Sequence, residues 1–332
     1  MFGATDLKNA IKVTDSSVEC PVRDCQTIVP RQRRTFRCSK DFFCQKHRIY
    51  ISPTTFEYQN YLDNPLWKDQ TDLDLLRRIA LVKRESRIAR DNSEDALTWN
   101  VFRFLEKENL LSTYLSNISK IDEKNIEVIY WSYSQTEKTA WSKLVQARKE
   151  FERNPSKGSE PDIIIKSDKT LFFIEAKLNA SNNTVPSSKD PMVKEKYVKS
   201  GLGWYQNVFT SDFDLLAKNY KKYELLRFWL LGSWMANHQD LNFVLINLVL
   251  SEKEKQIELQ FKKHVQEEPS RIFLRNTWED IFRLIQKTPE LSSQKKSILE
   301  YFLKKTLGYN HEGNLQREGY NHEGNLQRAF SI

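Results

Sequence analysis

The chain has 332 residues, of which 39% are hydrophobic and 29% are charged, as in a globular protein with one large domain or two smaller ones. Its longest apolar stretch, residues 225–236, contains Arg227 and is shorter than the ~20 residues of a membrane helix, and the opening residues MFGATDLK lack the apolar core of a secretory signal. We therefore expect a cytoplasmic protein with no membrane partner, whose net charge of +8 suits a phosphate-rich partner.

All four cysteines lie near the N-terminus, in a strongly basic part of the chain. Thiols stay reduced in a cytoplasmic protein of this length, so the cluster favours a metal site over disulfides. Zinc prefers four sulfur or nitrogen ligands in a tetrahedron, and two close pairs of ligands joined by a loop provide them. We predict a structural Zn²⁺ site formed by Cys20, Cys25 and Cys44, with either Cys38 or His47 as the fourth ligand.

Basic side chains crowd the same N-terminal segment, where bound zinc would order the loop that carries them. We expect these side chains to contact the phosphates of a nucleic acid, with a solvated basic loop as the alternative interpretation. The candidate phosphate-binding residues are Arg31, Arg33, Arg34, Arg37 and Lys40.

Further along the chain, the pattern of apolar residues predicts a mixture of helices and strands. Asn92 and Ser93 form an N-cap signal before one helix, and Asn154-Pro155 ends another. We predict short strands within 49–58 and 126–133, and helices at 73–90, 94–108 and 141–153.

Two short apolar runs, residues 162–166 and 171–177, predict a β-hairpin in the middle of the chain. A two-residue turn at Asp168-Lys169 pairs residues whose numbers sum to 337, and a four-residue loop gives the same register, whereas a three-residue loop does not. This register places Asp162 directly opposite Glu175, where Cβ atoms are about 4.5–5.5 Å apart.

Lys177 shares a strand face with Glu175 because side chains alternate along a strand. Two opposed carboxylates and a lysine among isoleucine and phenylalanine side chains are costly to bury unless something compensates them. Mg²⁺ prefers carboxylate oxygens as ligands, and a bound Mg²⁺ would compensate the two carboxylates. The alternative interpretation is a surface hairpin with a Glu–Lys pair on its solvent-exposed face.

The chain then continues with a polar loop, residues 179–190, which we expect to be mobile because it is rich in Asn and Ser. Near the C-terminus the sequence GYNHEGNLQR occurs twice without change, at 308–317 and 319–328. Two copies are too few for a solenoid, so we interpret the repeat as a duplicated hairpin end or tail. Between the loop and the repeat we predict helices at 194–209, 212–235 and 278–286, and a core strand at 241–250.

Glu160-Pro161-Asp162 followed by Ile174-Glu175-Ala176-Lys177 resembles the PD-(D/E)XK motif of the restriction-endonuclease-like nuclease superfamily. In that superfamily the Pro-Asp opens one strand and the Glu-x-Lys lies on the next. The resemblance implies that Asp162 and Glu175 bind the catalytic metal and that Lys177 is the third catalytic group.

Two further positions match less closely. The superfamily often adds a glutamate from an earlier helix, and Glu94 is the best match for this further metal ligand. Asp95 is the alternative residue. A second alternative is that either carboxylate only stabilises the helix N-terminus electrostatically. Many members also carry a glutamine on a later helix, where this chain has Glu224, and Gln206 is a second candidate for that position.

The resemblance implies an α/β fold, with a restriction-endonuclease-like core of a mixed sheet flanked by helices and a small zinc-stabilised N-terminal module. We expect three parts: the zinc-binding basic module at 1–60, the nuclease-like domain at 61–305 and the repeat tail at 306–332. The implied activity is hydrolysis of phosphodiester bonds with Mg²⁺ or Mn²⁺. The resemblance alone favours DNA over RNA as the substrate. It also implies that the chain can form a homodimer. The alternative is a nucleic-acid-binding protein whose nuclease-like fold no longer cuts.

Overall fold

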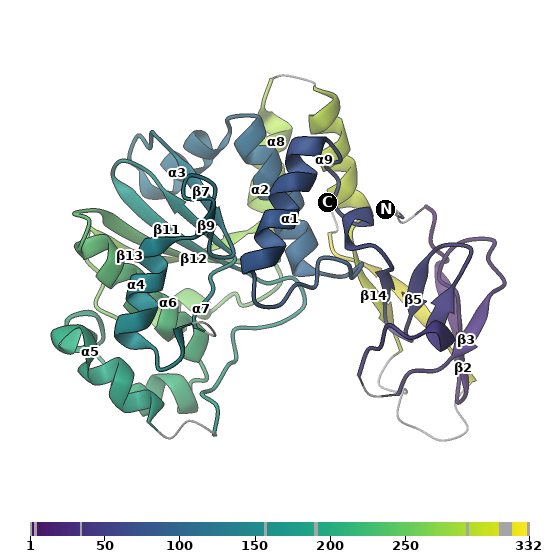
Figure 1. The fold of residues 1–332 in the computed structure, drawn as a ribbon, viewed down its shortest axis with the longest axis horizontal. Coiled ribbons are helices and arrows are strands. Elements are labelled where there is room, and N and C mark those ends of the chain that lie inside the picture. The colour runs from purple at the N-terminus through teal and green to yellow at the C-terminus, as the bar shows by residue number, and fades with distance from the viewer. Residues whose placement is uncertain are drawn as a thin grey trace. The chain divides into compact units, whose positions relative to one another are not determined.

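The computed structural model describes residues 2, 5–33, 35–155, 158–188, 192–289, 292–311 and 321–330. The chain forms two compact units, here called unit 1 and unit 2 (Figure 1). This division differs from the predicted one, because unit 1 takes residues from the beginning, the middle and the end of the chain. Unit 1 comprises Met1–Leu73, Ser86–Phe104 and Phe282–Ile332, and unit 2 comprises Asp74–Glu85 and Leu105–Ile281.

The larger sheet of unit 1 joins the two ends of the chain. Strand β15 pairs antiparallel with β1 on one side and with β14 on the other, so the repeat is part of the N-terminal fold and not a separate tail. β14 includes the first three residues of the first copy, Gly308 to Asn310, and β15 lies in the second copy, whereas residues 312–320 lie outside the described part of the chain. In the order β14-β15-β1-β2-β3, the strands are Thr306–Asn310, Asn321–Arg328, Ala10–Thr14, Ser17–Glu19 and Ile28–Pro30.

A second, smaller sheet of unit 1 contains β4 (Phe43–Cys44), β5 (Ile49–Ile51) and β6 (Phe56–Tyr58), which confirms the predicted strand and turn. Ile49, Ile51, Phe56 and Tyr58 point into one apolar cluster with residues of the larger sheet. The two sheets therefore share a single small core. Short 3₁₀ turns at Lys40–Phe42 and Tyr61–Asp63 precede β4 and follow β6.

The predicted basic helix at 73–90 is wrong at its C-terminal end. Helix α1 (Gln70–Val82) ends early because long-range contacts compete with helical hydrogen bonds in the segment that follows. The backbone N–H of Arg87 donates to the Asp95 carboxylate at 2.7 Å, and Arg90 pairs with Glu57. The predicted helices at 94–108 and 278–286 are confirmed as α2 (Glu94–Lys107) and α8 (Trp278–Lys287), and α9 (Ser293–Lys304) follows.

Unit 2 is built on a seven-stranded mixed sheet with the order β13-β12-β11-β10-β7-β8-β9. β11, β12 and β13 run parallel to one another, and the other neighbours are antiparallel. The middle strands read as continuous apolar runs because both of their faces are buried. The strands are Glu127–Tyr130, Tyr133–Ser134, Thr139–Ala140, Ile163–Lys166, Thr170–Ala176, Asn242–Val249 and Arg271–Thr277, from β7 to β13.

Helices α4, α5 and α6 pack into the core cluster that covers one face of this sheet (Figure 1). Two predicted helices are interrupted: α5 is broken at residues 200–203, and the predicted helix 212–235 is divided into a short π-turn and α6. None of the helices described combines the length and the apolar character needed to cross a membrane. The helical elements of unit 2 are α3 (Leu111–Ser119), α4 (Ser142–Phe151), α5 (Val193–Val208), the π-turn (Leu215–Asn219), α6 (Tyr223–Asn237) and α7 (Ile257–Lys262).

Candidate functional site

The hairpin of β10 and β11 has the predicted register. Ile163 pairs with Ile174 and Ile164 with Phe173, so paired residues sum to 337. The next pair beyond the ladder is Asp162 opposite Glu175. The sequence prediction therefore places these two carboxylates correctly relative to one another.

The turn of the hairpin is fixed by a buried carboxylate. Ser167 and Thr170 close the turn through a backbone hydrogen bond of 3.0 Å, and both of their hydroxyl groups donate to Glu123. Because Glu123 is fully buried, the register cannot shift without leaving this carboxylate without its donors.

Asp162 is held at the end of the hairpin by two donors. Its Oδ1 accepts a hydrogen bond from the indole Nε1 of Trp131 at 3.0 Å, and its Oδ2 accepts one from the backbone N–H of Ala176 at 2.9 Å. The first contact joins β7 to the residue before β10, and the second joins that residue to β11. The carboxylate thus has a defined position at the edge where three strands meet.

Trp131 and Ser132 have φ values of +43° and +78°, in the left-handed region that bulky side chains rarely adopt. The hydroxyl of Ser132 donates to Glu160 at 3.2 Å and accepts from Arg148 at 2.8 Å. This corner therefore supports both acidic residues of the Glu160-Pro161-Asp162 segment. Strained backbone that is held by surrounding contacts occurs preferentially at functional sites.

Glu175 and Lys177 lie on one face of the chain where β11 ends, and both are nearly buried, at 3% and 9% exposure. The ammonium group of Lys177 contacts the Glu175 carboxylate and also lies 3.0 Å from Oε2 of Glu224, in the first turn of α6. Burial raises the pKa of Glu175 well above its usual value, and the nearby carboxylates of Glu224 and Asp162 raise it further. With all three carboxylates ionised, the site would contain more negative charge than Lys177 alone compensates.

The candidate residues from helices have different outcomes. Glu224, which stands where many members of the superfamily carry glutamine, contacts Lys177, whereas Gln206 is exposed on α5. Glu94 is the half-buried first residue of α2 and belongs to unit 1, whereas Asp162, Glu175 and Lys177 belong to unit 2. Its role as a metal ligand stays a prediction.

The polar loop that follows β11 makes specific hydrogen bonds near its start, and the expectation that it is mobile stays a prediction. Asn182 is fully buried and donates to Asn247 at 2.7 Å and to Glu254. Asn247 is the residue of β12 paired with Glu175. The described part of the loop, up to residue 188, thus begins with an amide network next to the carboxylates.

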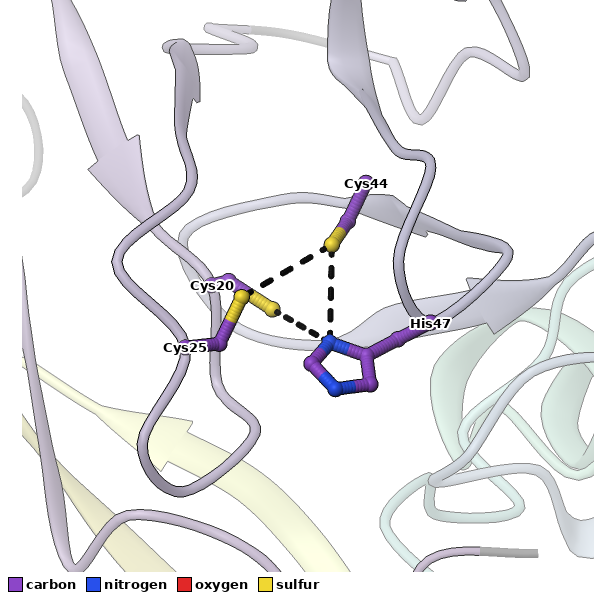
Figure 2. Close-up of side chains that lie close together, drawn as sticks. All are labelled: Cys20, Cys25, Cys44 and His47. Carbon is purple, nitrogen blue, oxygen red and sulfur yellow. Dashed lines mark hydrogen bonds between the residues drawn. The ribbon is translucent and has the colours of Figure 1, made fainter.

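In unit 1, Cys20, Cys25, Cys44 and His47 form a compact group that could hold a metal ion (Figure 2). Their ligand atoms all lie within 4.8 Å of one another; Sγ of Cys44 is 3.9 Å from Sγ of Cys25 and 3.5 Å from Nδ1 of His47. Burial raises the pKa of the Cys20 thiol, and burial lowers the pKa of His47. A neutral imidazole beside three closely spaced sulfurs is a donor set that suits a soft divalent cation.

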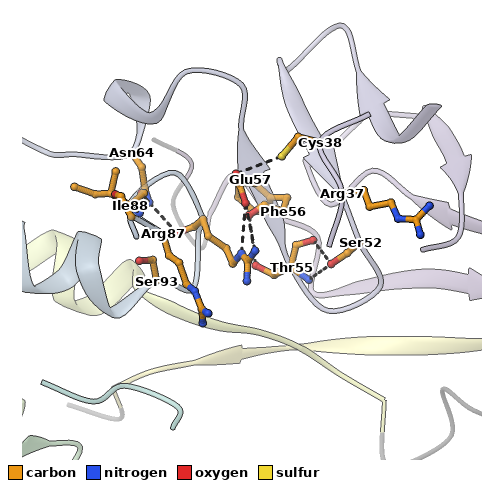
Figure 3. A network of polar contacts seen from close by, with 12 residues as sticks. Arg37, Cys38, Ser52, Thr55, Phe56, Glu57, Asn64, Arg87, Ile88 and Ser93 are labelled. Atoms are coloured by element: carbon orange, nitrogen blue, oxygen red, sulfur yellow. Dashed lines mark hydrogen bonds and ion pairs between the residues drawn. The ribbon is translucent and has the colours of Figure 1, made fainter. Parts of the chain in front are cut away.

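Of the two alternatives for the fourth ligand, the structure brings His47 and not Cys38 into this group. Cys38 is exposed, and its sulfur points to Oε1 of Glu57 at 3.3 Å (Figure 3). Burial and the Glu57 carboxylate raise the pKa of the Cys38 thiol to about 11, so a thiolate is disfavoured there. Cys38 therefore lies outside the group that could hold a metal ion.

The predicted phosphate-binding residues fall into two groups. Arg31 and Arg33 donate to backbone carbonyls of Thr14 and Asp15, at 3.2 and 3.1 Å. Arg37 and Lys40 are exposed. Arg34 lies outside the described residues.

Comparison with known proteins gives no relative: no family model, no curated protein and no solved structure matches the chain. The carboxylate–lysine site and the cysteine–histidine group are therefore interpreted from their own chemistry.

Proposed function

We propose that unit 2 is a metal-dependent nuclease that hydrolyses phosphodiester bonds in DNA. The observation that carries the proposal is the meeting of Asp162, Glu175 and Lys177 at one end of a buried hairpin. Two carboxylates on neighbouring strands with a lysine two residues beyond the second one match the PD-(D/E)XK arrangement. The mixed sheet and the helices that pack on it are consistent with the fold that the resemblance implies.

The donor set suits Mg²⁺ or Mn²⁺. Oxygen ligands from one or two carboxylates are typical of protein-bound Mg²⁺, and Asp162 and Glu175 would supply them. The raised pKa of Glu175 supports this assignment, because burial next to other carboxylates makes its ionised form costly unless a cation is added. When bound, the metal would lower the pKa of a coordinated water and neutralise charge on the phosphate.

The surrounding residues would position these groups. Trp131 and the Ala176 backbone fix the direction of the Asp162 carboxylate. Lys177, with its ammonium held between Glu175 and Glu224, would orient the attacking water or stabilise the charge that develops on the phosphate. Glu224 would keep Lys177 protonated and directed into the site.

We propose that Cys20, Cys25, Cys44 and His47 bind one structural Zn²⁺. All four tetrahedral positions are then filled by protein ligands, which leaves no open position for catalysis. The small core of unit 1 would gain stability from the metal. Exposed Arg37 and Lys40 in the same unit would contact phosphates of a nucleic acid.

The test is cleavage of supercoiled plasmid with Mg²⁺, with EDTA, and by the double variant Asp162→Ala/Lys177→Ala. A matched control is Asp168→Ala/Lys169→Ala, which removes the same two charges from the exposed turn of the same hairpin. We expect the wild type and the control to nick or linearise the plasmid, and EDTA and the site variant to abolish cleavage. Plasmid binding without cleavage by the wild type would instead favour the non-cleaving nucleic-acid-binding protein.

A further inference from the structure

A pocket of about 230 Å³ opens in unit 2 beside α6. Its wall contains three cations, Arg153, Lys196 and Arg227, against a single carboxylate, Glu152. Tyr197 and Tyr223 supply further hydroxyl groups to the same wall, whose composition is that of an anion site.

The carboxylate of Glu152 is already engaged inside the protein. It accepts hydrogen bonds from the backbone N–H of Ser159 at 2.8 Å, from Tyr197 at 3.0 Å and from Arg227 at 2.9 Å. Burial of its side chain, only 4% exposed, keeps it directed inward. Glu152 thus offsets the charge of Arg227.

The three cations of the pocket differ in their surroundings. Nε of Arg227 has no acceptor within the part of the chain that the structure describes. Lys196 forms no ion pair with any other described residue, and Arg153 is exposed. A neighbouring hollow of about 430 Å³ shares Arg153 and Lys196, so the two residues stand where two openings meet.

The pocket and the carboxylate–lysine site share two structural elements. On α6, Glu224 contacts Lys177 while Arg227 lines the pocket, and residues three apart on a helix have Cβ atoms about 5–6 Å from each other. On the other side, Ser159 binds the pocket carboxylate and lies three residues before Asp162. A nucleic-acid strand carries a phosphate at every nucleotide, so a strand with one phosphate at the carboxylate–lysine site presents further phosphates on either side of it.

We infer that this pocket binds a second phosphate of the nucleic-acid strand whose scissile phosphate lies at Asp162, through Arg153, Lys196 and Arg227. The identity of the strand rests on the proposed nuclease function. The pocket holds the strand in place next to the reacting phosphate, and its contribution is to binding rather than to the chemical step.

The test measures binding of a short fluorescein-labelled DNA duplex in EDTA, where cleavage plays no part, as a function of salt concentration. The variant is Arg153→Gln/Lys196→Gln, which leaves the buried Glu152–Arg227 pair intact. The matched control is Lys143→Gln/Lys149→Gln, which removes two exposed charges from α4 in the same unit. Unfolding temperatures of all three proteins establish that the substitutions leave the fold unchanged.

We expect the pocket variant to bind more weakly and to lower the slope of log K against log salt by about 0.9, the value for one phosphate contact. The control is expected to keep the wild-type slope. Equal slopes for the pocket variant and the control would overturn the inference.

A second arm distinguishes a strand phosphate from a free one. Inorganic phosphate is added at constant ionic strength, and the unfolding temperature is followed. Stabilisation of the wild type but not of the pocket variant, together with an unchanged DNA slope, would mean a free-phosphate site and would also overturn the inference. A pocket-dependent slope in a protein that fails to cleave plasmid would support the inference while contradicting the nuclease function.

Discussion

The indole nitrogen of Trp131 donates a hydrogen bond of 3.0 Å to Oδ1 of Asp162, from a backbone position with φ of +43°. A bulky residue in this conformation is stabilised only if its contacts compensate the strain. The Trp131–Asp162 bond is one such contact, and it connects the backbone corner after β7 with the proposed metal ligand. Trp131 is therefore a positioning residue for Asp162.

The substitution Trp131→Phe removes the indole donor and keeps most of the ring. We expect plasmid cleavage to fall by about 10–100-fold and to require more Mg²⁺, because a metal ligand that loses its orienting partner binds the metal less well. Cleavage rates at increasing Mg²⁺ concentrations measure both effects. Trp204→Phe is the matched control, since it removes an indole hydrogen bond to Ser233 elsewhere in unit 2. An unchanged Mg²⁺ dependence in Trp131→Phe would contradict the positioning role.

The metal centre makes a prediction that separates two cysteines. We expect the purified wild type and Cys38→Ser to contain one zinc per chain by elemental analysis, and Cys44→Ser to contain much less. The reason is that Cys44 belongs to the four-ligand group and Cys38 does not. Cobalt substitution should give sulfur-to-metal charge-transfer absorption in the first two proteins. Equal zinc loss in Cys38→Ser and Cys44→Ser would contradict the ligand assignment.

The buried side chain of Lys305 makes the stability of unit 1 depend on pH in the alkaline range. Its ammonium is buried, donates to the backbone carbonyl of Asp91 and lies over the ring of Tyr301, and burial lowers its pKa to about 8 although the Asp91 charge opposes this shift. The unfolded chain therefore binds the proton more tightly than the folded chain between about pH 8 and 10.5, so stability rises with pH in that window.

The difference in the free energy of unfolding between the wild type and Lys305→Met isolates this effect, because other titrating groups are common to both. We expect the difference to shift in favour of the wild type by up to about 3 kcal/mol across the window, since one pKa unit corresponds to about 1.4 kcal/mol. Denaturant titrations at several pH values measure it. A difference that stays constant with pH would mean that Lys305 keeps an ordinary pKa.

Leu202 lies between two glycines at the break of α5, with φ of +56° and a fully exposed side chain. Left-handed backbone costs a residue with a Cβ about 1–2 kcal/mol, and the exposed side chain regains little of this by packing. Leu202→Gly should therefore raise the free energy of unfolding by up to about 1 kcal/mol, after the entropy cost of glycine. Leu259→Gly, at an exposed position in α7, should lower it by about 1 kcal/mol. Similar losses in both variants would show that Leu202 is not strained.

The sequence predicted local features well. The hairpin register followed from the apolar runs and the Asp168-Lys169 turn, because both act within a few residues. The Trp131 donor could not be predicted, since it depends on how β7 pairs with β10 across thirty-one residues. The order of residue types around Trp131 and Ser132 does not indicate that their backbone has positive φ values.

The errors have the same physical origin. The sequence of residues 83–90 favours a helix. The structure departs from a helix because Asp95 accepts a hydrogen bond from the backbone of this segment and Glu57 forms an ion pair with one of its side chains. The spacing of Cys38 and His47 suits zinc equally well, and only the fold shows that Cys38 faces Glu57. Tertiary contacts thus override local preference at these positions.

Strand β15 lies between β14 and β1, and it pairs with β1 along the whole length of β1, from Ala10 to Thr14. During translation β1 leaves the ribosome roughly 15–60 s before its partner, at synthesis rates of about 5–20 residues per second. In that interval β1 is an open edge strand, which other chains can pair with. Completion of the cysteine-rich fold must therefore wait until β15 has been synthesised, and a nascent chain that stalls before residue 321 exposes a site for aggregation or chaperone capture.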